Sequence, residues 1–183
     1  MKRSSEVGLA AIGVIAFFFA ACDSRSADKG DHAKTLTADN IAIGMSLADF
    51  HAIFPQARLS SDGEWSRPDE LFGLRGDWTY SFYHKRLGWY LFNSYQSQVD
   101  KANFDLYLTA TRNAVKAYTD RLGEPAQVVD GILDFKNPAQ GYSGYPVLKA
   151  LWKAKDRTLR VDFTLLGSAG EQYQFLFTVE VSR

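Results

Sequence analysis

The feature of this sequence that most constrains its fold is a set of three long alternating runs toward the C-terminal end. In each run every second residue is apolar, and this period places the apolar side chains on one face of a β-strand. The three apolar faces consist of Leu148, Ala150, Trp152 and Ala154, of Leu159, Val161, Phe163 and Leu165, and of Tyr173, Phe175, Phe177, Val179 and Val181. Turn residues at 155–157 and 167–170 separate the runs. We therefore predict three antiparallel strands in this part of the chain.

The first half of the chain contains shorter runs of the same kind. Residues 78–84 and 89–95 predict two strands joined by a tight turn, and the alternation of apolar residues at 104–108 predicts a further strand. Two segments rich in glycine, proline and small polar residues, 60–76 and 136–146, predict long loops. Both halves of the chain thus predict antiparallel strands connected by turns and loops.

Two segments with helical spacing precede these groups of strands. Ser46 is the expected N-cap of the first helix, and Pro55 ends it. Thr109 or Thr111 is expected to cap the second, which ends at Gly123. The apolar stripes are Leu47, Phe50, Ile53 and Phe54 in the first helix and Val115, Tyr118 and Leu122 in the second. Because an amphipathic helix must bury its apolar stripe, we expect both helices to cover the sheet, which gives an α+β fold.

The order of elements, one helix followed by roughly four antiparallel strands, occurs twice. We assign the first αβ unit to residues 40–109 and the second to 110–183. This order resembles the tandem-repeat architecture of β-lactamase inhibitor proteins and the related small outer-membrane assembly lipoproteins, with Gly44-Met-Ser-Leu47 and Leu122-Gly-Glu-Pro125 as the matching motifs. The resemblance implies a non-catalytic module that binds another protein. The alternative is any α+β sandwich whose halves happen to look alike.

The N-terminal segment predicts export. A positive start, Met1-Lys-Arg3, precedes an apolar run from Val7 to Phe19, which has the length of a signal peptide and is too short for a membrane span. The sequence Phe19-Ala-Ala-Cys22 resembles the lipobox of bacterial lipoproteins, a resemblance that implies removal of residues 1–21 and lipidation of Cys22, with palmitate among the acyl chains. The alternatives are an ordinary signal peptide cleaved at an Ala-x-Ala-like site and an uncleaved anchor.

The segment after the cysteine predicts a flexible tether. Residues 22–39 are polar, small and without a periodic pattern, which is typical of a linker. Asp23 resembles the signal that retains enteric lipoproteins in the inner membrane, although an outer-membrane location stays open. We therefore expect a body attached to a bacterial envelope membrane through Cys22 and facing the periplasm.

No catalytic motif emerges from the sequence. The histidines are His32, His51 and His84, which share no metal-ligand spacing, and Cys22 is assigned to the anchor, so we predict no metal site and no cofactor. The first long loop carries a charged cluster of Asp62, Glu64, Arg67, Asp69 and Glu70. Paired carboxylates can act as acid and base, but a loop of this composition is more often solvated.

Charge and aromatic content indicate the kind of partner. The chain has 21 Lys and Arg and 21 Asp and Glu, so without its leader it is near −1, and a nucleic-acid partner is not expected. Exposed aromatic side chains often mark protein interfaces. The candidate contact residues are Trp65 and Phe72 in the first loop, Tyr90 and Phe92 on a strand, and Tyr142 and Tyr145 in the second loop. We expect an envelope protein as the partner; a small-ligand or lipid carrier is the alternative, and a hydrolase with an unrecognised site is the third possibility.

Overall fold

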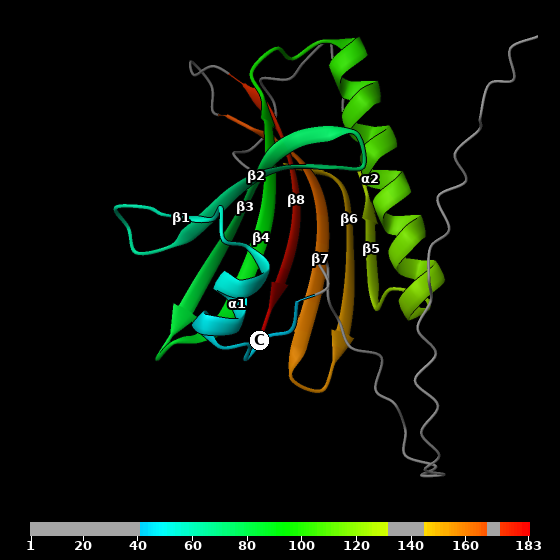
Figure 1. The fold of residues 1–183 in the computed structure, drawn as a ribbon. Helices are drawn as coiled ribbons and strands as arrows, with labels where there is room; N and C mark the ends of the chain where they lie inside the picture. Colours follow the sequence, from blue (N-terminus) through cyan, green and yellow to red (C-terminus); the bar gives the residue numbers. More distant parts are fainter. Residues whose placement is uncertain (1–40, 132–144, 168–172) are drawn as a thin grey trace, which may run out of the picture. The chain divides into compact units, whose positions relative to one another are not determined.

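The predicted strands lie in one antiparallel sheet. A computed structural model describes residues 41–131, 145–167 and 173–183 (Figure 1). Its elements are α1 (Leu47–Ile53), β1 (Arg58–Leu59), β2 (Trp65–Leu71), β3 (Leu74–Tyr83), β4 (Arg86–Gln96), α2 (Lys101–Leu122), β5 (Gln127–Asp130), β6 (Tyr145–Ala154), β7 (Arg157–Leu166) and β8 (Gln174–Ser182). The described strands form an eight-stranded sheet in the order β1-β2-β3-β4-β8-β7-β6-β5. The mixed α+β class predicted from the sequence is confirmed.

One face of this sheet forms the core. The register aligns the apolar positions of neighbouring strands, as in the row of Tyr80, Tyr90, Val181 and Leu159. All four of these side chains are fully buried. Aromatic rings pack across the strands, for example Phe92 against Phe177 at 6.1 Å between centroids. The alternating runs therefore predicted the correct buried faces.

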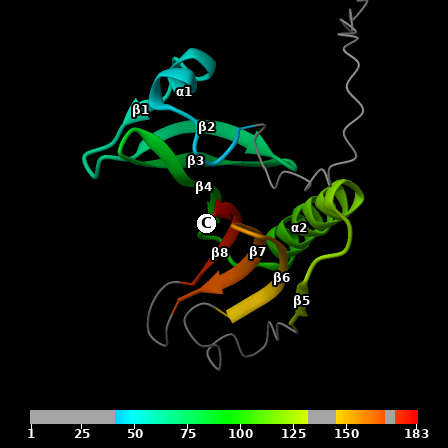
Figure 2. The same ribbon diagram turned by 90° about the horizontal axis from the view of Figure 1, so that it is seen from below.

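Both helices pack on this apolar face. In α1, the ring of Phe50 lies 4.7 Å from that of Tyr80 on β3. In α2, Tyr107 lies 5.8 Å from Phe163 on β7, and Tyr118 lies 5.9 Å from Trp152 on β6. Figure 2 shows α2 alongside β6, β7 and β8. The helices thus cover the face that the apolar periodicity defines.

The predicted caps of the helices met different outcomes. Ser46 is the N-cap of α1 and its hydroxyl accepts a hydrogen bond from Asp49 N–H, as expected. Gly123 ends α2 with a φ of 88°, a conformation that glycine adopts without strain. The predicted N-cap of α2 is wrong. Asp100 is the cap, and Thr111 lies buried inside the helix with its hydroxyl bonded to the carbonyl of Tyr107.

The strand predicted at 104–108 is also wrong, because these residues lie in the 22-residue helix α2. Phe104 and Leu108 are four residues apart and both pack on the core, whereas Leu106 is 48% exposed. Three alternating apolar residues fit a strand, but the pattern continues at helical spacing through Ala114 and Tyr118. The second helix therefore begins at Lys101 and not near 110.

The loop predicted at 60–76 contains a strand. Strand β2 pairs with β3 along its whole length, while β1 pairs with only its first two residues. The rest of β2 is an edge strand, where Pro68 is tolerated because no outer neighbour needs its missing N–H. An edge strand can also be polar, so β2 lacks the apolar alternation that predicts a strand from sequence. Residues 132–144, which hold most of the predicted loop 136–146, lie outside the described residues.

Candidate partner-binding face

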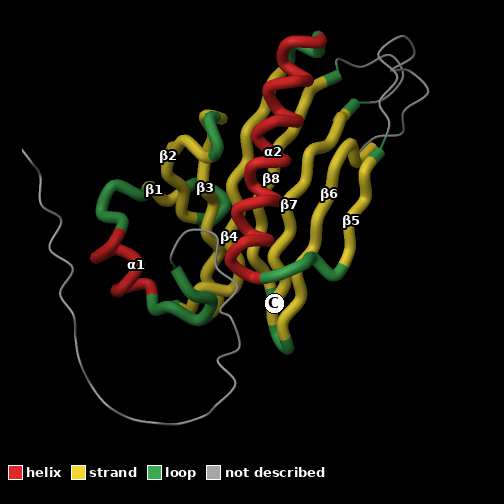
Figure 3. The backbone as a smooth tube through the Cα atoms, turned by 90° about the vertical axis from the view of Figure 1, so that its right-hand side faces the viewer, coloured by secondary structure: helices red, strands yellow, loops and turns green. Residues whose placement is uncertain are grey.

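The face of the sheet opposite the helices carries polar and charged side chains. We call it the open face and define it by two rows of residues that the register places side by side. One row is Thr79, Leu91, Glu180, Arg160 and Leu151, and the next is Asp77, Asn93, Thr178, Asp162 and Lys149. In Figure 3, α2 lies in front of strands β7 and β8, on the face opposite the open face. Within the described ranges, neither helix packs on the open face.

Charged side chains link the central strands of the open face. Arg160 Nη2 on β7 lies 2.7 Å from Glu180 Oε2 on β8, and Arg160 Nε lies 3.9 Å from Asp162 Oδ2. The Thr164 hydroxyl donates to Asp162 Oδ1 at 2.8 Å. These groups form a charged ladder in the middle of the sheet, where arginine and carboxylates can form ion pairs with a docking surface.

Burial raises the pKa of Asp162 above its ordinary value, and the nearby carboxylate of Glu180 acts in the same direction. The hydrogen bond from Thr164 and the positive charges of Arg160 and Lys149 oppose this shift without cancelling it. A raised folded-state pKa means that the ionised carboxylate is less favourable in the folded chain than in the unfolded chain. The contribution of Asp162 to fold stability therefore falls as the pH rises from below the unfolded pKa to neutral.

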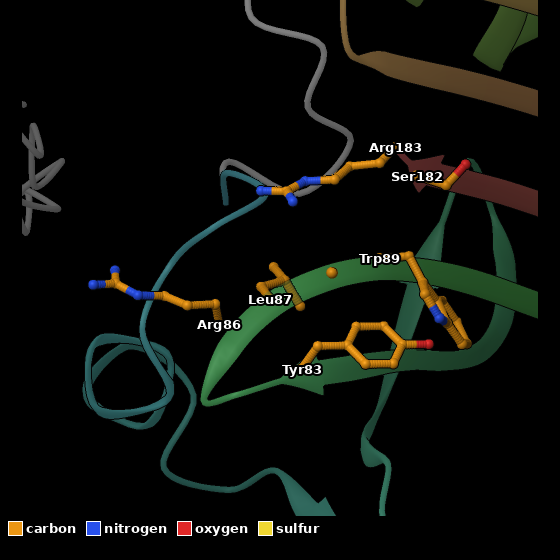
Figure 4. Close-up of a pocket in the computed structure, with 7 residues that line it drawn as sticks. Tyr83, Arg86, Leu87, Trp89, Ser182 and Arg183 are labelled. Atoms are coloured by element: carbon orange, nitrogen blue, oxygen red, sulfur yellow. The ribbon is translucent and has the colours of Figure 1, made fainter.

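The end of the open face near the β3–β4 turn is hollowed. The hollow has a volume of about 250 Å³ and is lined by Tyr83, Arg86, Leu87, Gly88, Trp89, Ser182 and Arg183 (Figure 4). The Tyr83 ring lies over Gly88, where a Cβ atom would come within 2.4 Å of it. Tyr83 is 61% exposed, and Figure 4 shows its ring beside the side chain of Trp89. The aromatic residues that line this hollow, Tyr83 and Trp89, are thus not among those predicted to contact a partner.

A second polar cluster lies on the helix-covered face, beneath α1. Arg67 is 7% exposed; its Nε donates to Tyr80 Oη at 2.9 Å, and its Nη1 lies 2.6 Å from Asp69 Oδ2. Its guanidinium carbon lies 4.4 Å from the centroid of the Phe54 ring, and Trp78 Nε1 donates to Asp69 at 3.1 Å. This cluster connects α1, β2 and β3. The charged segment predicted to be solvated is therefore partly built into the core.

Asp69 is held as a carboxylate by this cluster. Burial by itself would raise the pKa of Asp69, but hydrogen bonds from the Glu70 N–H, Arg67 and Trp78, together with the charge of Arg67, lower it overall. Every polar contact of Asp69 described here stays within the protein. The arrangement thus joins α1, β2 and β3.

The aromatic residues predicted to contact a partner lie mostly on the helix-covered face. Tyr90 and Phe92 are completely buried, so the expectation that they form an exposed aromatic surface is wrong. They alternate toward the helices because their neighbours in the register, Val181 and Val179, are core residues. Trp65 is partly buried with its ring 4.1 Å from that of His51, and Phe72 lies 6.1 Å from Tyr118.

The remaining candidate residues fall where the structure gives no side-chain description. Cys22, Asp23 and Tyr142 lie outside the described residues, and Tyr145 begins β6 but its side chain is likewise not described. In the described ranges, no helix combines the length and apolarity needed to cross a membrane. No group of three or more metal-ligating side chains occurs among these residues either.

The charged ladder is the feature that the sequence analysis missed. Arg160 and Asp162 alternate with the apolar residues of β7, and Glu180 alternates with those of β8. The period that predicted the buried face also indicated which residues occupy the other face.

Comparison with known proteins adds no relative, since no family model, curated protein or solved structure matches the chain.

Proposed function

We propose that this chain is a bacterial envelope lipoprotein whose body binds another envelope protein through the open face. The observation that carries the proposal is the charged ladder of Arg160, Glu180 and Asp162 on a sheet face that neither α1 nor α2 covers. The three side chains are half-buried on this face, and such an arrangement of opposite charges selects a partner with the complementary arrangement and excludes others. The proposed role is non-catalytic.

Asp162 supports a functional explanation of the ladder. Its raised pKa means that the ionised carboxylate contributes less to fold stability than the protonated form does. Residues that cost stability are commonly kept for function. The partly exposed Leu91 and Leu151 and the 57% exposed Tyr95 add apolar area around the ladder, as expected of a protein interface.

The exported and anchored state is part of the proposal. Residues 1–21 form the leader, Cys22 carries the lipid, and residues 22–39 are the tether. Two or more acyl chains hold a protein stably on a membrane, whereas one binds only marginally. Asp23 favours the inner membrane, with the outer membrane as the other possible location. The body then faces the periplasm.

We also propose that the body consists of two related αβ units. The element order α1, β1–β4, α2, β5–β8 repeats one helix and four strands, and β4 and β8 meet in the middle of the sheet. The second unit then starts with α2 at Lys101. This residue lies inside 40–109, the range that the sequence predicted for the first unit. This arrangement supports the resemblance to tandem-repeat inhibitor and assembly proteins.

A charge exchange across the ladder tests the binding face. Arg160→Glu places two carboxylates side by side, so it should weaken both the fold and partner binding. The double variant Arg160→Glu with Glu180→Arg restores an ion pair inside the sheet but reverses the charge order presented to a partner. We expect it to recover stability in urea denaturation while co-purification from cross-linked envelopes remains lost. Recovery of co-purification together with stability would refute a role in recognition.

Labelling with palmitate tests the anchor separately. The chain should incorporate the label and fractionate with membranes, and Cys22→Ser should abolish both. Asp23→Ser should redirect the labelled protein from the inner to the outer membrane if Asp23 acts in sorting. Label that persists in Cys22→Ser would contradict the assignment of the anchor.

A small-ligand carrier is the second candidate, favoured by the hollow beside Tyr83 and Trp89. Its volume of about 250 Å³ is below the range of roughly 300–1,000 Å³ usual for ligand sites. The fluorescence of Trp89 offers a test, because a ligand stacked in the hollow would change it. A shift produced by envelope extract depleted of protein, and absent in Trp89→Phe, would favour the carrier.

A further inference from the structure

One end of the sheet is strongly basic. We call it the basic end and define it by Lys85, Arg86, Lys153, Lys155, Arg157 and Arg183. Lys85 and Arg86 lie at the β3–β4 turn, and Lys155 lies at the β6–β7 turn. The register brings these positions together, because Lys153 is opposite Thr158, Thr158 is opposite Ser182, and Tyr90 is opposite Val181. Both turns lie near the C label at the bottom of Figure 1.

Fewer carboxylates than cations lie at this end. Among the described residues these carboxylates are Asp49, Asp156 and, in the β1–β2 turn that the register places toward the same end, Asp62 and Glu64; Arg157 Nε is 3.8 Å from Asp156. Glu124, after the end of α2, is balanced by Arg121 in the last turn of that helix. Five of the six defining cations are exposed, Arg157 being the exception. The excess of positive charge therefore faces outward.

The opposite end of the sheet shows no such excess. Its β2–β3 turn is flanked by Glu70 and Arg75, and α2 begins there with Asp100 and Lys101. Among the described residues of this end, Arg75 lies 4.0 Å from Glu70 and Lys101 pairs with Asp105, so the cations there have carboxylate neighbours. Because the chain as a whole has equal numbers of acidic and basic residues, the basic end reflects where the charges are placed and not the composition.

The segment that leads to Cys22 joins the body at this basic end. Tyr90 Oη donates to the carbonyl of Ile41 at 3.1 Å, and Gly44 N–H donates to the carbonyl of Leu87 at 2.7 Å. Ser46 forms an isolated bridge with Arg86. The first described residues thus run beside the start of β4, within the cluster of cations.

From these observations we infer that the basic end is a docking surface for an anionic phospholipid membrane. The inference rests on the proposed lipid anchor at Cys22 and adds an orientation to it. A flexible linker of eighteen residues has a typical end-to-end distance of about 23 Å. The eleven residues of β4 extend over roughly 36 Å, so the opposite end is held farther from the bilayer than the tether usually reaches.

Electrostatics and side-chain type agree with this occupant. Cations near an anionic bilayer gain attraction within about one Debye length, roughly 10 Å at 0.1 M salt. The tether adds to this attraction by keeping the basic end at high local concentration near the surface. Tyr83 and Trp89 border the same end, and these two residue types favour the membrane–water interface. The strands would then stand upright on the bilayer, with the open face directed sideways.

Binding to vesicles without the acyl anchor tests this inference. The processed chain, residues 22–183 with Cys22→Ser, contains every described helix and strand. We expect it to sediment with vesicles of phosphatidylcholine containing phosphatidylglycerol, and not with vesicles of phosphatidylcholine alone. The triple variant Lys85→Gln, Lys153→Gln, Lys155→Gln should bind about a hundredfold more weakly, at roughly fivefold for each cation removed.

A matched control separates the basic end from net charge. The triple variant Arg75→Gln, Lys101→Gln, Arg112→Gln removes the same charge from exposed positions elsewhere and should bind within about twofold of the parent chain. Replacing the same three lysines by arginine keeps their charge and should leave vesicle binding at the level of the parent chain. Equal losses in the two glutamine variants, or no binding to anionic vesicles, would overturn the inference.

Three further outcomes distinguish the possible failures. The chain could bind a DNA duplex as tightly as it binds anionic vesicles, and the variant with Lys85, Lys153 and Lys155 changed to glutamine could lose both kinds of binding. In that case the inference that the basic end docks on a membrane is wrong. Palmitate labelling without vesicle binding refutes only the orientation proposed here. Vesicle binding without labelling refutes the lipid anchor and leaves the surface as a direct membrane contact.

Discussion

Replacing Arg67 by methionine should destabilise the fold through the cluster beneath α1. The bond from a charged donor to Tyr80 contributes about 1.5–3 kcal/mol, and the contact with the Phe54 ring adds about 1 kcal/mol. The pair with Asp69 adds less than about 1 kcal/mol, because the Asp69 side chain is 37% exposed to screening solvent. Methionine keeps apolar contacts of the stem, so the expected net loss is about 3 kcal/mol.

Urea denaturation of the processed chain with Cys22→Ser measures this loss. The midpoint should fall without a change in the denaturant slope, and the melting temperature should drop by about 6–12 °C. Arg75→Met is the matched control, since the Arg75 side chain is 93% exposed, and it should change stability by less than about 0.5 kcal/mol. If Arg67→Met is as stable as this control, the cluster does not hold α1 on the sheet.

The effect of Arg67→Met should also depend on pH. The pKa of Asp69 is lowered in the folded chain, so its carboxylate stabilises the fold above the unfolded pKa of about 3.9. That contribution is lost as the pH falls through the folded pKa. Arg67 supplies part of the lowering, so the difference between parent and variant should shrink on acidification. A difference that stays constant from pH 7 to below the unfolded pKa would contradict the assigned cause.

Three further substitutions test other parts of the account. Asp162→Asn should raise stability at pH 7, because the folded pKa of Asp162 is raised; the gain should vanish below about pH 3.9, and a loss at pH 7 in urea denaturation would be the contrary result. Gly76→Ala should cost about 3 kcal/mol, since its Cβ would lie 2.1 Å from the carbonyl oxygen of Asn93 on β4; thermal melting checks this, and a cost below 1 kcal/mol would contradict the close approach. Asp100→Ala should cost about 1 kcal/mol by removing the N-cap bond of α2, measurable as lost stability in urea; no change would favour a cap at another residue.

The sequence predicted the elements whose apolar period was long. Strands β6, β7 and β8 each place four or five alternating apolar positions toward the core, so their faces followed directly from the pattern. The first turns of α2 were misread because three alternating apolar residues imitate a strand, although the middle one, Leu106, is exposed on the helix. Strand β2 was missed because its sequence is polar, and because the pairing with the neighbouring strand β3 and the bond from Arg67 to Tyr80 leave no apolar period in the sequence.

The candidate site was predicted less well than the fold. Aromatic residues were chosen for their type, but side-chain type alone does not reveal which face they occupy. The register shows that Tyr90 and Phe92 belong to the core, because it pairs them with buried residues of β8. The charged ladder depends on the pairing of β7 with β8, which no local pattern specifies. The basic end depends likewise on turns and chain ends that only the folded sheet brings together.

The measurement that tests the central claim most directly is site-specific photocross-linking in intact envelopes. A photoreactive side chain at Leu91 would lie in the middle of the open face, while the same group at the 48% exposed Leu106 would lie on α2. We predict a discrete cross-linked product with another protein from position 91 and none from position 106. Products from position 106 alone, or none from position 91 under conditions where the chain is membrane-bound, would contradict binding through the open face.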